Sequence, residues 1–315
     1  MTSWLPFWPA SASAYADRID LLVWAFSALI VSLAAPVVVG MVWFAAKYYR
    51  GSPADRSHAP TRGFWVEADW TVIPFLLAMV FFVWAAHLYY VERTPPGGAL
   101  EVAVVAKQWM WKFQHPGGQR EINELHVPTG QPVKLTMTSQ DVIHSLFLPE
   151  LRLKMDVLPD RYTTIWFQAD RPGTYALRCT QFCGTDHALM GGRFIVQEPR
   201  DYEAWLRSSA VDGTLAQEGE RLFRRLGCSG CHGANASVHA PDLAGIYGTQ
   251  QPLSDGTFAL ADDRYIRDSI LMPKRQVVAG YEPIMPSFAG KVSEEEILRL
   301  IAYVKSLPRE GNRQP

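Results

Sequence analysis

The sequence has only 4 cysteines in 315 residues, too few for a disulfide framework. They form two close pairs, Cys179 with Cys183 and Cys228 with Cys231, and no thiol is left over. This pairing indicates ligand or attachment sites. An excess of charge of one sign is also lacking, since 30 Lys and Arg balance 31 Asp and Glu. Without an overall basic field the chain has no general attraction for phosphates, so we expect no nucleic acid partner.

Internal repeats and low-complexity runs are missing too, but the apolar residues are distributed very unevenly. No residue from 21 to 46 is charged, and about 26 residues at roughly 1.5 Å each exceed the ~30 Å of a bilayer's hydrocarbon core. A second uncharged run covers residues 70–91. We therefore predict a membrane anchor over residues 1–96 with spanning helices at about residues 21–47 and 70–91.

The basic residues near these helices predict the orientation of the anchor. The segment between the helices carries four of them: Lys47, Arg50, Arg56 and Arg62. The outer flanks carry only Arg18 and Arg93 close by. Because loops rich in Lys and Arg stay in the cytoplasm, we expect both termini on the outer side of the membrane. The first 16 residues have no basic region typical of a signal peptide, so the first helix is expected to target the chain itself.

The rest of the chain changes character twice. Strand-like segments follow a turn-rich break at residues 94–98 and occur at residues 100–106, 133–138, 162–168, 173–178 and 192–196. They predict a β-sandwich over residues 97–198. After a linker at 199–213 the pattern becomes helical, most clearly at 217–226 and 294–307, the latter with a capping box from Ser293 to Glu296. The fold class is thus multidomain: a helical hairpin, a β-sandwich and an all-α domain over residues 214–315.

The helical domain contains the motif Cys228-Ser-Gly-Cys231-His232. Two thiols one helical turn apart can bond to the two vinyl groups of a haem, and the adjacent His can supply an axial nitrogen to the iron. A redox disulfide or half of a zinc site is the alternative.

The second axial ligand must come from later in the chain. Met285, just before the capped C-terminal helix, is our candidate, because a thioether suits an electron-transfer haem. Met272 is the rival, although it ends a helical pattern and is better explained by packing. His239 is a more distant third.

The helical domain resembles class I cytochromes c over residues 214–308. Gly219 and Phe223 match the family's N-terminal helix, and Tyr303 matches the aromatic residue that crosses it. Pro241 matches the proline whose segment supports the axial His.

A second constellation, Cys179-Thr-Gln181-Phe-Cys183-Gly-Thr-Asp-His187-Ala-Leu-Met190, lies in the predicted β-sandwich with His144 upstream. Two thiolates, two imidazoles and a thioether form a soft ligand set that favours copper. A tetrahedral zinc site and a Cys179–Cys183 disulfide are the alternatives, but neither uses Met190. A mononuclear blue-copper site needs one Cys, so two Cys indicate a binuclear centre bridged by both sulfurs.

Here the chain resembles subunit II of the haem–copper cytochrome c oxidases, from about residue 20 to residue 197. The resemblance implies a cupredoxin-like sandwich and a binuclear copper A centre. Its ligands would be His144, Cys179, the backbone carbonyl of Gln181, Cys183, His187 and Met190. A magnesium ion at the interface with subunit I is also implied. However, Gln181 stands where most members have Glu, and it lacks the carboxylate that helps to bind that ion.

Two further residues take roles from this resemblance. Trp109, in Gln108-Trp109-Met110-Trp111, matches the residue at which electrons enter, although interface or core aromatics explain such a cluster as well. Glu67 matches a carboxylate at the mouth of a proton channel in subunit I, and it could equally be a favourable dipole partner at a helix N-terminus.

Together these features predict the subunit through which electrons enter a bacterial caa-type terminal oxidase. Electrons would pass from haem c to copper A and on to subunit I, which reduces oxygen to water and translocates protons. The expected partners are subunit I, subunit III, the lipid bilayer, and either a quinol-oxidising complex or a cytochrome or cupredoxin donor. The alternatives are the small subunit of a copper A-containing nitric oxide reductase and a free-standing membrane electron carrier.

Overall fold

The computed structural model describes residues 8–57, 63–209, 213–233, 238 and 240–308. These residues belong to two compact units. One comprises residues 13–94, and the other combines the residues before it with everything from residue 95 onward.

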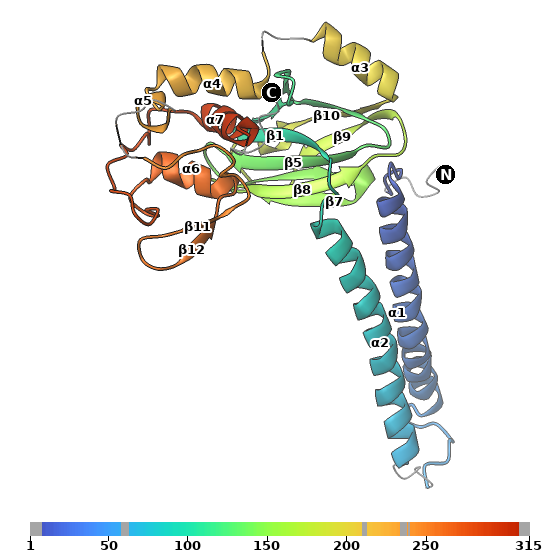
Figure 1. Ribbon diagram of the computed structural model, residues 1–315. Coiled ribbons are helices and arrows are strands. Elements are labelled where there is room, and N and C mark those ends of the chain that lie inside the picture. The colour runs from blue at the N-terminus through green and yellow to red at the C-terminus, as the bar shows by residue number, and fades with distance from the viewer. Residues whose placement is uncertain (1–7, 58–62, 210–212, 234–237, 239, 309–315) are drawn as a thin grey trace. The chain divides into compact units, whose positions relative to one another are not determined.

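The first unit is a pair of long helices, α1 (Ala14–Lys47) and α2 (Phe64–Arg93), which lie side by side (Figure 1). Both are long and apolar enough to cross a membrane, and they include the two predicted spans. The hydroxyl of Ser13 caps α1 by accepting a hydrogen bond from the amide of Ala16 at 3.0 Å. The rings of Phe26 and Phe81 join the helices, with centroids 5.5 Å apart. Most other apolar side chains of this unit are exposed, as expected of surfaces that face lipid.

The second unit begins with a sandwich of two five-stranded sheets. The first sheet has the order β3-β2-β1-β5-β8, with strands at Arg120–Ile122, Met110–Gln114, Leu100–Lys107, Pro132–Ser139 and Thr163–Gln168. The second has the order β4-β10-β9-β6-β7, with strands at Glu124–Pro128, Gly191–Gln197, Gly173–Cys179, His144–Leu148 and Leu153–Val157.

The two sheets bury apolar side chains against each other. Val104 and Leu135 come from the first sheet and Leu146 from the second, and none is more than 1% exposed. The rings of Phe167 and Phe194 meet edge to face across the sheets, with centroids 5.4 Å apart. This core supports the end of the sandwich where β9 ends and β6 begins.

Helix α3 (Pro199–Ser208) occupies much of the expected linker and packs on the sandwich. Tyr202 and Trp205 of α3 contact a buried network in which Glu121 lies between two histidines. His115 Nε2 is 2.8 Å from a Glu121 oxygen, and His126 Nδ1 is bonded to the other. The Trp205 ring stacks on His126, with centroids 4.6 Å apart. The chain is therefore anchored to the sandwich up to Ser208, and residues 210–212 lie outside the described part.

The C-terminal domain contains the helices α4 (Leu215–Arg225), α5 (Ser229–His232), α6 (Asp263–Leu271) and α7 (Glu294–Ser306), with a small hairpin of β11 (Gln250–Pro252) and β12 (Phe258–Leu260). The capping box at Ser293 is confirmed, and a second one caps α4. Helices α4 and α7 cross at Gly219, where an added Cβ would lie 2.0 Å from the carbonyl oxygen of Arg299.

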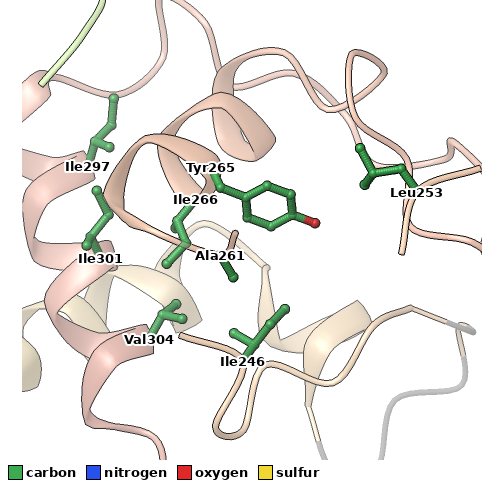
Figure 2. Packing of buried hydrophobic residues seen from close by; sticks show 8 residues of the cluster. All are labelled: Ile246, Leu253, Ala261, Tyr265, Ile266, Ile297, Ile301 and Val304. Atoms are coloured by element: carbon green, nitrogen blue, oxygen red, sulfur yellow. The ribbon is translucent and has the colours of Figure 1, made fainter. Parts of the chain in front are cut away.

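Figure 2 shows the core of this domain, where α7 faces α6 and the loop that contains Ile246. Ile297, Ile301 and Val304 of α7 are at most 5% exposed, as the predicted apolar face of this helix requires.

Candidate metal and haem sites

The two cysteines of the sandwich lie together at the end of β9. Cys179 is its last residue and Cys183 lies in the loop that follows. Their Sγ atoms are 3.9 Å apart, and both thiols are free and buried. The thioether of Met190 lies 3.7 Å from Cys183 Sγ, and the carbonyl oxygen of Gln181 lies 3.4 Å from Cys179 Sγ.

Two imidazoles complete this cluster. His144, the first residue of β6, is fully buried, and its Nε2 is bonded to Asp141 at 2.8 Å. Its Nδ1 is buried without a hydrogen-bond partner, which leaves a lone pair free for a metal. His187 Nδ1 lies 3.4 Å from Cys183 Sγ. Ligand atoms of His144, Cys179 and Cys183 all lie within 4.8 Å of one another, so the donor set fits a soft metal.

The two thiols differ in their protonation. Burial alone would raise the pKa of Cys179, but the nearby His144 ring and hydrogen bonds from backbone amides lower it to about 6. Burial and the neighbouring Cys179 thiolate raise the pKa of Cys183 to about 12. Cys179 is therefore the more acidic of the two thiols. Because metals bind thiolates, a metal pair that uses both sulfurs must displace the proton of Cys183.

A second layer of residues holds this cluster in place. The amide of Gln108 donates to Cys183 O at 2.7 Å through Nε2, and its backbone N–H donates to Asp141 at 2.8 Å. The sequence analysis gave neither Gln108 nor Asp141 a role. An acid three residues before a candidate His ligand could have indicated Asp141, because metal-binding histidines often donate their second N–H to a carboxylate.

The candidate Trp109 and its neighbour Trp111 lie at different depths. Trp109 packs on Gly184, where an added Cβ would be 3.2 Å from the indole ring, and so lies beside the residue after Cys183. Trp111 is fully buried, with its ring 6.0 Å from that of His144.

The haem motif lies at the mouth of an apolar cavity in the C-terminal domain. Cys228, Cys231 and His232 line this cavity of about 360 Å³ together with Met285 and Leu300. His232 Nδ1 donates to the carbonyl oxygen of Pro241 at 2.9 Å, which leaves Nε2 free for iron. An apolar cavity with two thiols, an oriented imidazole and a thioether fits a covalent haem.

The rival ligand Met272 does not line this cavity. It borders an adjoining pocket next to Met285, and its side chain is 41% exposed. His239 lies outside the described residues. Glu67 lies in the first turn of α2, in the other unit, and is exposed.

Comparisons with known proteins match both domains. Residues 119–198 match the family model of the cytochrome c oxidase subunit II periplasmic domain, and residues 216–308 match that of cytochrome c. Cytochrome c oxidase subunit 2 of Alkalihalophilus pseudofirmus is 27% identical over 309 residues, which cover 90% of this chain and 87% of that protein. The protein of the same name from Bacillus subtilis is 26% identical and covers 78% of this chain and 75% of its own length.

Other relatives cover less. Alternative cytochrome c oxidase subunit 2 of Bradyrhizobium diazoefficiens is 32% identical, and the match covers 39% of this chain and 56% of that protein. Among solved structures, the periplasmic domain of subunit II of cytochrome oxidase from Bradyrhizobium japonicum is 28% identical with a TM-score of 0.36, covering 37% of this chain and 96% of that one. With the structure, the family matches confirm the predicted architecture of two apolar helices, a cupredoxin-like β-sandwich and a cytochrome c domain. They also indicate copper and haem c as cofactors.

Proposed function

Since the chain belongs to the cytochrome c oxidase subunit II family and carries a cytochrome c domain behind its β-sandwich, we propose that its own haem is where electrons enter the oxidase. From the haem they pass to a binuclear copper centre and then to subunit I. We call residues 97–198 the copper domain and residues 214–308 the haem domain. The chain is a subunit of a haem–copper oxidoreductase complex and supports the entry of electrons into it.

In the haem domain, Cys228 and Cys231 would hold the macrocycle, and His232 and Met285 would bind its iron. Haem iron supplies one-electron chemistry at this place. The chain's own contribution is to orient His232 through Pro241 and to exclude water with the apolar wall of the cavity.

In the copper domain, the thiolates of Cys179 and Cys183 and the imidazoles of His144 and His187 would hold the copper pair. Met190 and the carbonyl of Gln181 would be its weaker ligands. Sharing two sulfurs spreads the electron and keeps reorganisation small. Trp109, which packs beside this site, is the residue at which electrons reach the copper domain.

The orientation of the anchor determines on which side of the membrane the two domains meet their partners. The basic segment between α1 and α2 lies in the cytoplasm, so the copper and haem domains lie on the outer side, next to subunit I and subunit III. Glu67 lies at the mouth of a proton channel in subunit I. The external donor is a quinol-oxidising complex or a small cytochrome or cupredoxin.

One observation carries this proposal: the fold brings four segments far apart in sequence into two redox sites within one compact unit. Within the copper domain, the unpartnered Nδ1 of buried His144 supports a metal there, because burying a nitrogen without a partner is costly.

The test is the double variant Cys228→Ser with Cys231→Ser in the purified complex, which keeps every copper ligand. We expect it to lose most turnover with the natural donor, while artificial reductants still reduce the copper. Rapid-mixing absorbance, followed separately at haem and copper wavelengths, distinguishes the two centres. Normal copper reduction by the natural donor in the haem-less protein would overturn the proposed path.

Metal analysis tests the copper site itself. The complex should contain two coppers in this chain, and the mixed-valence form should show one electron shared equally between them by electron paramagnetic resonance. One zinc, or a Cys179–Cys183 disulfide in the copper-loaded complex, contradicts this. Oxygen and nitric oxide consumption by the same complex separate an oxidase from a nitric oxide reductase.

A further inference from the structure

The haem domain is docked on the copper domain through charged pairs at both ends of one interface. At one end Lys112 pairs with Glu295 at 2.7 Å, and Arg120 pairs with Glu218. At the other end Lys305 pairs with Glu101 at 3.1 Å. Arg267 pairs with Asp160 at 3.2 Å and also with Glu294, so this pair lies near the start of α7. Tyr162 of the copper domain adds apolar contact with the core cluster of the haem domain.

The Lys112–Glu295 and Lys305–Glu101 pairs lie at opposite ends of α7 and have reversed signs. The copper domain presents the base Lys112 to the start of α7 and the acid Glu101 to its end. A haem domain rotated end for end would bring like charges together, which is costly. The pattern therefore specifies one orientation of the haem domain.

In this orientation α7 is a wall between the haem cavity and the copper domain. Leu300 and Val304 line the cavity from one side of α7, and it lies against β1 of the copper domain (Figure 1). At 100° per residue, Glu295 projects from the opposite side of the helix to Val304. One helix, about 10–12 Å across, separates the cavity from the copper domain.

Glu295 makes the contact at the start of α7. Its two carboxylate oxygens accept hydrogen bonds from Lys112 Nζ at 2.7 Å and from Gln140 Nε2 at 2.6 Å. Its side chain is 14% exposed, so salt screens this pair less than a free surface pair. Burial by itself raises the pKa of Glu295, but the hydrogen bond from Lys112 and a backbone N–H hold it below its usual value, so the carboxylate stays charged.

The contact continues directly into the copper site. The backbone N–H of Gln140 is fixed to β1 by a hydrogen bond to Ala106 O at 2.9 Å. The next residue, Asp141, accepts from His144 Nε2 at 2.8 Å and from the backbone of Gln108 at 2.8 Å. Gln108 in turn donates to the carbonyl of Cys183. The loop that receives the haem domain thus also orients two of the candidate copper ligands.

We propose that Glu295 docks the haem domain on Lys112 and Gln140, at the corner of the copper domain that holds the copper ligands. The loop after Gln140 extends this contact to the copper site, with Asp141 as the positioning residue for His144. This rests on the proposed function, in which the fused haem reduces the copper. One electron crosses per step: Fe(II) haem becomes Fe(III), the copper pair gains one electron, and no bond or proton changes place.

Zero-length cross-linking tests the docking without relying on either metal. Carbodiimide should join Lys112 to Glu295 in the full-length subunit, both with copper bound and after its removal, as read by peptide mass spectrometry. Glu295→Gln must abolish this link, and it should also reduce the link between Lys305 and Glu101, which reports the other end of the interface. Absence of the Lys112–Glu295 link in the unmodified subunit at low salt would refute the docking.

The rate of electron transfer from haem to copper after flash reduction tests whether this docking supports the transfer. Loss of this partly buried pair should lower the docking equilibrium constant about tenfold, so the salt concentration that halves the rate should fall in Glu295→Gln. Glu295→Lys combined with Lys112→Glu should restore this salt concentration, the midpoint of the salt dependence, to its wild-type value. The matched control is Glu220→Gln, which removes the same charge from a pair with Arg224 within α4. If Glu295→Gln and the control share the wild-type midpoint, the docking contact is refuted.

Asp141→Asn separates positioning from docking. It should leave the Lys112–Glu295 cross-link unchanged. It should alter the copper hyperfine pattern and the copper reduction potential, because a neutral amide replaces the carboxylate that accepts the hydrogen bond from His144 Nε2. An unchanged copper spectrum and potential would refute the role of Asp141. If the unmodified protein shows no haem-to-copper transfer at any salt concentration, the proposed function fails instead.

Discussion

Replacing Gly219 with Ala should destabilise the haem domain, although Ala is the better helix former. Gly219 lies within α4 at its crossing with α7, and an added Cβ would be 2.0 Å from the carbonyl oxygen of Arg299 and 2.8 Å from Cβ of Tyr303. Ordinary contact begins at 3.4 Å, so the two helices would have to separate by more than 1 Å. Because the nearest atom belongs to the backbone of α7, a side-chain rotation cannot relieve the clash.

The magnitude follows from two opposing effects. Ala in place of Gly gains about 1 kcal/mol of helix propensity. Overpacking costs about 1–3 kcal/mol and more when backbones must move, so we expect a net loss of about 2 kcal/mol. For a domain of roughly this size each kcal/mol lowers the melting temperature by about 4–8 °C, which gives a decrease of about 10 °C.

Thermal melting of the haem absorbance in the loaded protein measures this effect. The control is Glu220→Ala at the next position of α4, which removes only an exposed pair with Arg224 and should cost at most about 0.5 kcal/mol. A Gly219→Ala protein that melts at or above the wild-type temperature would show that helix propensity outweighs the crossing, and the reasoning would be wrong.

Three further outcomes are expected. Met285→Ala should abolish the weak long-wavelength band of iron–thioether bonding in the oxidised haem and lower its potential, whereas Met272→Ala should do neither; the reverse result would reassign the ligand. Burial raises the pKa of Glu121, but hydrogen bonds from two histidines hold it below its usual 4.5, so its contribution to stability is complete above pH 4.5 and is lost as the pH falls below. Acid should therefore loosen α3, read as the fluorescence difference between wild type and Trp205→Phe, and Glu121→Gln should lack this transition. Gln181→Glu should increase manganese binding to the complex, measured by electron paramagnetic resonance; equal binding would show that the side chain here does not govern the interface ion.

Local sequence patterns predicted those helices and strands that a short stretch of sequence is enough to identify. The helices α4 and α7 follow from their helical sequence pattern, α7 also from its capping box, and both spans follow from uncharged runs. Five strands were predicted because they are long or bounded by turns. The five short strands β2, β3, β4, β6 and β7 of the sandwich and the hairpin of β11 and β12 were not predicted, nor were α3 and α6. Each of those strands has at most 5 residues, too few for a clear alternation of apolar and polar side chains. In addition, β4 and β6 are held by β10 and β9, which lie far along the chain, and no short window of sequence contains both partners.

The sequence by itself determined which side chains can carry the chemistry, because Cys179, Cys183, His187 and Met190 lie within one short segment, as do the residues of the haem motif. Their identity and spacing already select soft metals and a covalent haem. Only the tertiary structure decided how these sites are supported and connected. The free Nδ1 of His144 depends on Asp141, and the contact of Glu295 with Gln140 joins residues 155 positions apart. Such contacts are set by the packing of whole domains and by the charges that this packing brings together, so no pattern in the sequence marks them in advance.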